Sequence, residues 1–235
     1  DGDVSLGTST LTVNTGGRTN PLSITAGSSM APAADLLLGD AQMSISSSGN
    51  PVGNTGLVLT ATGDIDLGSS DLNYFQNRNV LASSYQDQIT AGGNIYSSAA
   101  PDGDPNNFLN NYVITGDSGP LDMTAGGSIV LTDLFLDVNE VDGNLSRNAT
   151  IAANGGILDL GSSSISVDES LTLTSNSNII FDSPTLTTIN GGDMDINAGG
   201  TLTFQDGTLN SNGFLHLHGD GDVSLGTSTL TVNTG

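Results

Sequence analysis

The stretch PDGDPNN, residues 101–107, carries side chains that could bind a metal ion. It places Asp102, Asp104 and Asn106 at alternating positions. Oxygen ligands spaced in this way suit a hard cation, so Ca²⁺ is the candidate ion. The glutamate that completes a helix–loop–helix calcium site is missing, and solvated turn residues are the favoured alternative. No other cofactor is expected.

Two histidines near the C-terminus form a second candidate. His216 and His218 alternate with Leu215 and Leu217, so both imidazoles are expected on one outward face. A pair at this spacing can share a metal ion. Because no third ligand of a suitable kind is evident, an exposed polar face is favoured.

Aromatic residues are few, and all four tyrosines lie between residues 74 and 112. The cluster consists of Tyr74, Phe75, Tyr85, Tyr96, Phe108 and Tyr112. One interpretation is a lateral contact patch for carbohydrate or for a neighbouring filament, because tyrosine offers contact area at low entropic cost. The favoured alternative is a small satellite core that folds these longer segments onto the main body.

The charge balance excludes several classes of function. The net charge is −22, and the only cationic side chains besides two histidines are Arg18, Arg78 and Arg147. Nucleic acids and anionic membranes require basic patches, so neither is expected as a partner. No apolar run is long enough to insert into a bilayer. Lyase chemistry on acidic polysaccharide also requires basic groups, and we expect no enzyme. Hydrolysis of a neutral glycan by an aspartate pair is the remaining catalytic alternative.

The elements that must position these residues follow from a repeated motif. Its clearest copies are LVLTATGDIDL (57–67), ITAGGNIY (89–96), LDMTAGGSIVL (121–131) and MDINAGGTLTF (194–204). Apolar residues at every second position predict strands with one buried face. The small-residue centre predicts a tight corner, where glycine tolerates positive φ and a larger side chain would collide with the next coil. The expected corner glycines are Gly63, Gly93, Gly127, Gly156, Gly200 and Gly221, and the looser copies place Gly2, Ser28 and Ser177 at the same position.

A second motif follows each corner at a fixed distance. Segments such as LGTSTLTV (6–13) and LGSSSISV (160–167) place two apolar residues five positions apart, which interrupts the alternation and predicts a turn between two strands. Each coil is then strand, corner, strand, turn, strand and loop. Stacked coils of this kind form an all-β parallel β-helix. An antiparallel sandwich of hairpins is the competing fold.

The chain also contains a long exact repeat. Residues 1–16 and 220–235 are the same string, DGDVSLGTSTLTVNTG, which defines a period of 219 residues. The corner positions divide this period into eight coils. We therefore expect residues 1–219 to be one tandem-repeat unit and residues 220–235 to begin the next, so that the first partner of each unit is an identical repeat.

The strings ITAGGNI, MTAGGSIVL and INAGGTLTF resemble the repeats of filamentous haemagglutinin-like exoproteins, the adhesins of two-partner secretion. The resemblance implies a right-handed β-helical shaft on the bacterial cell surface, with a role in cell adhesion, aggregation or biofilm. Neighbouring filaments, cell-surface glycans and matrix polysaccharide are the partners it implies. A purely architectural sheath or surface-layer filament without a receptor is the first alternative, and a β-helical glycan-binding or glycan-hydrolysing protein is the second.

Overall fold

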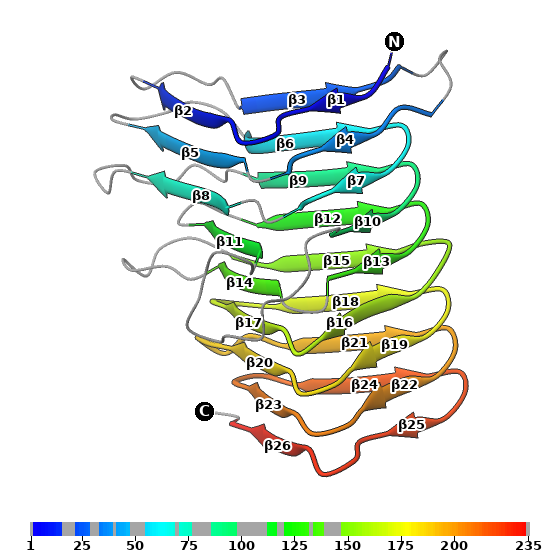
Figure 1. Cartoon of the computed structure of the whole chain (residues 1–235). Coiled ribbons are helices and arrows are strands. Elements are labelled where there is room, and N and C mark those ends of the chain that lie inside the picture. The colour runs from blue at the N-terminus through cyan, green and yellow to red at the C-terminus, as the bar shows by residue number, and fades with distance from the viewer. Residues whose placement is uncertain are drawn as a thin grey trace.

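A computed structural model gives the fold of the chain. It describes residues 2–15, 22–28, 33–39, 41–47, 55–68, 71–76, 86–97, 112–116, 120–131, 134–138 and 147–233. All regular structure in these residues is β-strand, and the strands stack along one axis from the N-terminus to the C-terminus (Figure 1).

The strands form three sheets, which we name A, B and C. Sheet A contains β1 (Val4–Ser5), β4 (Leu36–Leu37), β7 (Ile65–Asp66), β10 (Ile95–Tyr96), β13 (Ile129–Val130), β16 (Leu158–Gly161), β19 (Ile179–Phe181), β22 (Leu202–Phe204) and β25 (Val223–Ser224). Sheet B contains β2 (Thr10–Thr15), β5 (Gln42–Ser47), β8 (Asp71–Gln76), β11 (Tyr112–Gly116), β14 (Leu134–Val138), β17 (Ser164–Val167), β20 (Thr185–Thr188), β23 (Thr208–Ser211) and β26 (Thr229–Val232). Sheet C contains β3 (Leu22–Ala26), β6 (Thr55–Ala61), β9 (Gln86–Ala91), β12 (Leu121–Ala125), β15 (Ala149–Ala153), β18 (Leu171–Ser175), β21 (Met194–Ala198) and β24 (Leu215–Gly219).

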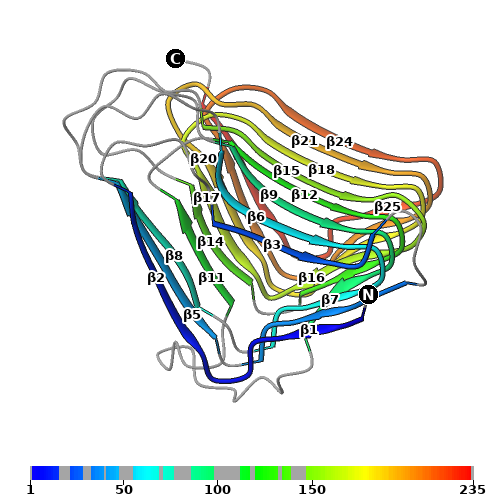
Figure 2. The same ribbon diagram turned by 90° about the horizontal axis from the view of Figure 1, so that it is seen from above.

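Each strand pairs in parallel with the strand at the same position of a neighbouring coil. This pairing confirms the parallel β-helix and excludes the antiparallel sandwich. Seen from the N-terminal end, the chain passes from β1 to β2 to β3 clockwise while it recedes from the viewer, so the helix is right-handed (Figure 2).

The period of the sequence matches a whole number of coils. β25 begins at Val223 and β1 begins at Val4, which is a separation of 219 residues. Both strands lie in sheet A, as its first and last members. Eight coils therefore separate equivalent positions, as the corner spacing predicts.

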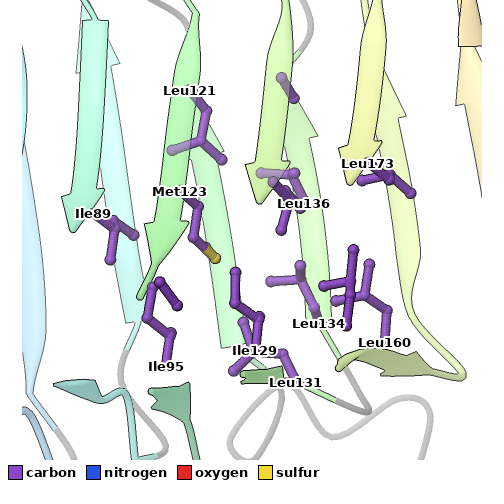
Figure 3. Close-up of a cluster of buried hydrophobic side chains, with 14 of the residues drawn as sticks. Ile89, Ile95, Leu121, Met123, Ile129, Leu131, Leu134, Leu136, Leu160 and Leu173 are labelled. Carbon is purple, nitrogen blue, oxygen red and sulfur yellow. The ribbon is translucent and has the colours of Figure 1, made fainter. Parts of the chain in front are cut away.

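The core lies between the three sheets, where inward-facing residues stack in rows from coil to coil. Sheet C buries a row of aliphatic residues that includes Ile89, Met123, Ile151 and Leu173. Figure 3 shows part of this cluster, with Ile95, Ile129, Leu134 and Leu160 from the other two sheets. Short strands are stable in this arrangement because each buried Leu or Ile contributes about 1.5–3 kcal/mol through removal from water.

One corner lies elsewhere than the sequence spacing predicts. The N–H of Gly63 donates to the carbonyl of Ala34, which places Ala34 in the corner row of the second coil. The sequence assigned this position to Ser28, and that assignment is wrong. β3 ends at Ala26 and β4 begins only at Leu36, so the connection is longer than in the coils that follow. Residue intervals alone do not reveal such an insertion.

Candidate interaction surface

The six expected corner glycines all lie between sheet C and sheet A. The N–H groups of Gly93, Gly127 and Gly221 donate to the carbonyls of Gly63, Gly93 and Gly200, at 2.8 to 2.9 Å. None of the six has positive φ, so that part of the sequence argument is wrong. Positive φ occurs mainly at the turn between sheets A and B, as at Gly39 and Gly68, and also at Gly27 in the connection from β3 to β4.

Crowding explains why the corner positions are glycine. A Cβ added to Gly93 would lie 2.1 Å from Oδ1 of Asp64, and one added to Gly127 would lie 2.4 Å from Oδ1 of Asn94. The collision is thus with a side chain of the preceding coil. Because glycine has no Cβ, the corner has room for this oxygen atom of the preceding coil.

These side-chain oxygens form a ladder along the corner, which we call the corner oxygen ladder. Oδ1 of Asp3, Asp35 and Asp64 accepts the N–H of Asp35, Asp64 and Asn94, at 3.0, 2.7 and 2.6 Å. In the following coils, the N–H of Ser128 donates to Oδ1 of Asn94, and the N–H of Ile157 donates to Oγ of Ser128. The same contact recurs further along the chain, where the N–H of Thr201 donates to Oδ1 of Asn178. Each bond satisfies a backbone N–H at the corner, at a net gain of about 1 kcal/mol.

These residues were not among the candidates predicted from the sequence, although a signal was present. In the clearest motif copies the residue directly after the corner glycine is Asp64, Asn94, Ser128 or Thr201. All four have short side chains with an oxygen that can accept a hydrogen bond from a nearby backbone N–H. The signal is the recurrence of this residue type at one position.

The first coils give the ladder an acidic end. Asp3, Asp35 and Asp64 stack on consecutive coils, and the phenol of Tyr96 lies near two of them. Partial burial, and then the charges of Asp66, Asp64 and Asp35, raise the pKa of Tyr96 above its usual value. The surface beside Tyr96 is therefore anionic, and its phenol stays neutral at physiological pH.

The predicted aromatic patch is distributed over two sheets. Tyr74 and Phe75 lie in β8 and Tyr112 lies in β11, both in sheet B, whereas Tyr96 lies in β10 of sheet A. Tyr85 and Phe108 are outside the described residues. In the described register Gly116, not Tyr112, is opposite Tyr74. A shared contact patch stays a prediction.

The two metal hypotheses have different outcomes. Asp102, Asp104 and Asn106 lie outside the described residues, so the Ca²⁺ site stays a prediction. His216 and His218 lie on the outer face of β24, with ring centroids 6.2 Å apart. Nδ1 of His216 is 2.9 Å from Oδ1 of Asp195, and Nε2 of His218 is 3.0 Å from Oδ1 of Asp220. Within the part of the chain that the structure describes, no three His, Asp or Glu residues are arranged to hold a metal ion.

A buried charged group marks the corner between sheets B and C. Arg147 is 2% exposed and Asp168 is 5% exposed. The N–H of Glu169 donates to the carbonyl of Arg147 at 3.0 Å, so Asp168 lies on the neighbouring coil. Asp168 also accepts a hydrogen bond from Nδ2 of Asn190 at 2.5 Å. Buried charges require such compensation, and no sequence pattern predicted this one.

Short hydroxyl side chains cover much of the outer face of sheet C. Thr25, Thr60, Thr90 and Thr124 are opposite one another on consecutive strands. Thr174 continues the same row beyond Ala152. This row presents hydroxyl and methyl groups at the spacing of the strands, about 4.8 Å.

Fold and surface together define a parallel β-helix with an acidic corner and hydroxyl-rich faces. Searches with protein-family models, against curated proteins and against solved structures found no match for the chain. In the described residues there is no helix long and apolar enough to cross a membrane.

Proposed function

We propose that this chain is a shaft segment of a repetitive extracellular protein on the bacterial cell surface, where it forms a filament or stalk for adhesion, aggregation or biofilm. The resemblance of its motifs to filamentous haemagglutinin-like repeats supports the class of protein. It also supports export by two-partner secretion. The role is structural and adhesive, without catalysis.

One observation carries the proposal. The 219-residue repeat corresponds to eight complete coils, so a repeated unit ends at the same position within a coil at which it began. Tandem units of this kind stack into one rod without a break in any sheet. At about 4.8 Å per coil, each unit lengthens the rod by about 38 Å.

The charge of the rod determines which partners it can approach. Without the duplicated Asp220 and Asp222, the net charge of −22 becomes −20 for one period. Over about 38 Å this density approaches that of duplex DNA, about one charge per 1.7 Å. Such rods repel one another at low salt and associate when cations screen or bridge them. Neighbouring filaments, cell-surface glycans and matrix polysaccharide are the proposed partners.

An architectural sheath without a receptor is the second candidate. The hydroxyl row on sheet C favours it, because a regular face of short side chains is suited to lateral packing of rods. A glycan-binding role predicts saturable binding that is lost when Tyr74, Tyr85 and Tyr112 are replaced by Ala. A sheath predicts a continuous coat on intact cells, whereas an adhesin predicts single projections.

The length of tandem chains tests the shaft. Proteins with one, two and three copies of residues 1–219 should form rods whose lengths in electron micrographs increase by about 38 Å per copy. Separate globules joined by flexible segments would refute the proposal.

The response to cations tests lateral association. Ca²⁺ or Mg²⁺ should bundle the rods at an ionic strength at which Na⁺ does not, because divalent ions bridge carboxylates as well as screen them. Equal bundling by Na⁺ would leave screening alone as the cause. No bundling by any of the three would remove cation-mediated association from the proposal.

A further inference from the structure

The two histidines of the chain lie on one strand and one face. His216 and His218 are the second and fourth residues of β24, which lies beside β21 in sheet C (Figure 1). Their side chains are 63% and 47% exposed, whereas the alternating Leu215 and Leu217 are partly buried and packed against the core. Both imidazoles are therefore accessible from solvent on the same outward face.

A carboxylate holds one nitrogen of each ring. Nδ1 of His216 lies 2.9 Å from Oδ1 of Asp195 on the neighbouring strand, and Nε2 of His218 lies 3.0 Å from Oδ1 of Asp220. A carboxylate only accepts hydrogen bonds, so each of these ring nitrogens donates its N–H. In a neutral imidazole the other nitrogen then keeps its lone pair. The two basic atoms that remain are Nε2 of His216 and Nδ1 of His218.

Histidines that bind metal ions are commonly held in this way. The second ring nitrogen of a metal-ligating histidine usually donates its N–H to a carboxylate or a carbonyl, which fixes the tautomer and the orientation of the ring. Asp195 and Asp220 supply such acceptors, and they place negative charge beside both rings in a chain of net charge −22. This charge attracts cations to the face that carries the imidazoles.

The spacing of the rings suits a single shared ion. Their centroids are 6.2 Å apart and their planes differ by 18°. An ion bound to one nitrogen of each ring at about 2.1 Å holds the two ring centres roughly 5–6 Å apart. Because residues at alternate positions of a strand point to the same side, rotation of the two exposed side chains is enough to bring both free nitrogens to one ion.

We propose that His216 and His218 chelate one divalent transition-metal ion, Cu²⁺, Ni²⁺ or Zn²⁺, on the outer face of sheet C. Imidazole nitrogen suits these ions, whereas Ca²⁺ and Mg²⁺ prefer oxygen ligands. Nε2 of His216 and Nδ1 of His218 are the ligands, and Asp195 and Asp220 position the rings. Water fills the other coordination positions, since no set of three His, Asp or Glu residues in the described ranges is arranged to hold an ion.

The site does not depend on the proposed adhesive role or on the sequence that adjoins this stretch. All four residues lie between Asp195 and Asp220, within one unit. Where units stack into a rod, the site recurs with each unit, about 38 Å apart along the axis. It also differs in its ions from the bundling proposed above, which involves Ca²⁺ or Mg²⁺ and carboxylates. Failure of the metal site would therefore leave the shaft, which rod length tests, unaffected.

Calorimetric titration of the full 235-residue chain with NiCl₂ tests the chelate. Millimolar Ca²⁺ in the buffer competes for carboxylates, so that binding to imidazole is measured. One Ni²⁺ per chain is expected. His216→Asn and His218→Asn should each lower the affinity by on the order of 100-fold, because the second contact is no longer intramolecular. Each single substitution should thus remove almost all of the affinity that the double substitution removes.

Two other outcomes would overturn the chelate. Two ions per chain, with one lost for each substitution, would show two separate single-histidine sites. Unchanged binding in the double variant would show that Ni²⁺ binds elsewhere. Circular dichroism verifies that each variant keeps its β-structure, and both substituted side chains are well exposed.

Two substitutions at one carboxylate test its role in positioning the ring. Asp195→Ala and Asp195→Asn remove the same charge, but the asparagine keeps an oxygen that can accept the N–H of His216. Asp195→Ala should weaken Ni²⁺ binding by about tenfold, and Asp195→Asn should restore most of that loss. Equal losses would show that Asp195 acts through its charge alone and would overturn its positioning role.

Electron paramagnetic resonance of the Cu²⁺ complex identifies the ligands directly. The unaltered chain should show coupling of the copper to two imidazole nitrogens, and each single histidine variant should lose this signature. A change in folding alone would not produce this difference. A spectrum with oxygen ligands only, or with a single nitrogen, in the unaltered chain would overturn the proposal.

Discussion

The last four coils, residues 147–233, are shorter than the coils that precede them. Their corner residues are 21 to 23 positions apart, whereas the corners from Gly63 to Gly156 are 29 to 34 apart. In the last coils, polar contacts connect neighbouring coils at the B–C corner as well, as between Asn148 and Ser170 and between Asp193 and Phe214. Most of the B–C connections of the earlier coils lie outside the described residues, so the two regions are compared in their sheets and at the other two corners.

From β6 onward, the C–A corner is the constant part of this fold. Backbone hydrogen bonds join the coils through it from Gly63 to Gly155 and again from Ser177 to Gly221, whereas the N–H of Ser177 donates to Oγ of Ser175. The extra residues of the long coils fall mainly between sheets B and C and, between β10 and β11, between sheets A and B. The connection from β3 to β4 is the exception, because it carries extra residues at the C–A corner. The following predictions test this division.

The largest loss of stability is expected where an added Cβ would collide with a backbone carbonyl of the preceding coil. A Cβ on Gly192 would lie 1.7 Å from the carbonyl oxygen of Glu169, and one on Gly126 would lie 2.2 Å from that of Gly92. Gly192→Ala and Gly126→Ala should each lower the free energy of unfolding by about 3 kcal/mol in urea denaturation. Gly2→Ala, whose Cβ meets no atom within 4 Å, is the control. If Gly126→Ala resembled the control, the C–A corner would not be equally rigid in the long coils.

A slightly smaller loss in the free energy of unfolding is expected at Arg147, where the last four coils begin. Arg147→Ala removes a buried cation from the coil next to the one that carries the buried carboxylate of Asp168. A buried charge that is left without compensation typically lowers the free energy of unfolding by about 3 kcal/mol. The double variant with Asp168→Asn should recover part of the loss in thermal unfolding. Independent, additive losses would show that the two residues do not act together.

The corner oxygen ladder should respond to salt in the early coils only. Asp64→Asn preserves an acceptor for the N–H of Asn94 and removes one of three stacked charges. It should therefore raise the melting temperature at low salt, and the gain should vanish near 1 M salt, where the Debye length is about 3 Å. Asn178→Ala, which removes the acceptor for Thr201, should cost about 1 kcal/mol at any salt concentration. The same salt response in both variants would contradict the division.

The smallest expected effect is on how stability depends on pH, through Asp159. Partial burial, followed by the nearby charge of Asp182, raises the pKa of Asp159 above its usual value, although the N–H of Gly161 opposes the shift. The folded state then binds the proton more tightly than the unfolded state. This group therefore lowers stability above its folded pKa, and the penalty disappears as pH falls below the unfolded value. Asp159→Asn should melt at a higher temperature than the unaltered chain at pH 7 and at the same temperature at pH 3.

The sequence was sufficient for the architecture because its pattern is local. Alternation around Gly127 and Gly200 predicts the two strands and the corner, and the 219-residue identity predicts the coil number. The position of Ala34 was missed because an insertion changes the interval without changing the residue types. Crowding at the corner glycines was predicted, but against the next coil instead of the preceding one, because the sequence does not show which neighbouring side chain fills the space. The burial of Arg147 could not be predicted, because a single polar residue in a connection carries no periodic signal.

Because the 219-residue repeat contains a whole number of coils, such a molecule can change in length by whole units. A unit of eight whole turns begins and ends in the same sheet, so every row of side chains continues into the next unit. Gain or loss of a unit would alter the length of the molecule and leave its three sheets, its charged corner and its hydroxyl face continuous across the junction. Had the unit comprised a fractional number of turns, every change in copy number would have rotated all later surfaces relative to the earlier ones.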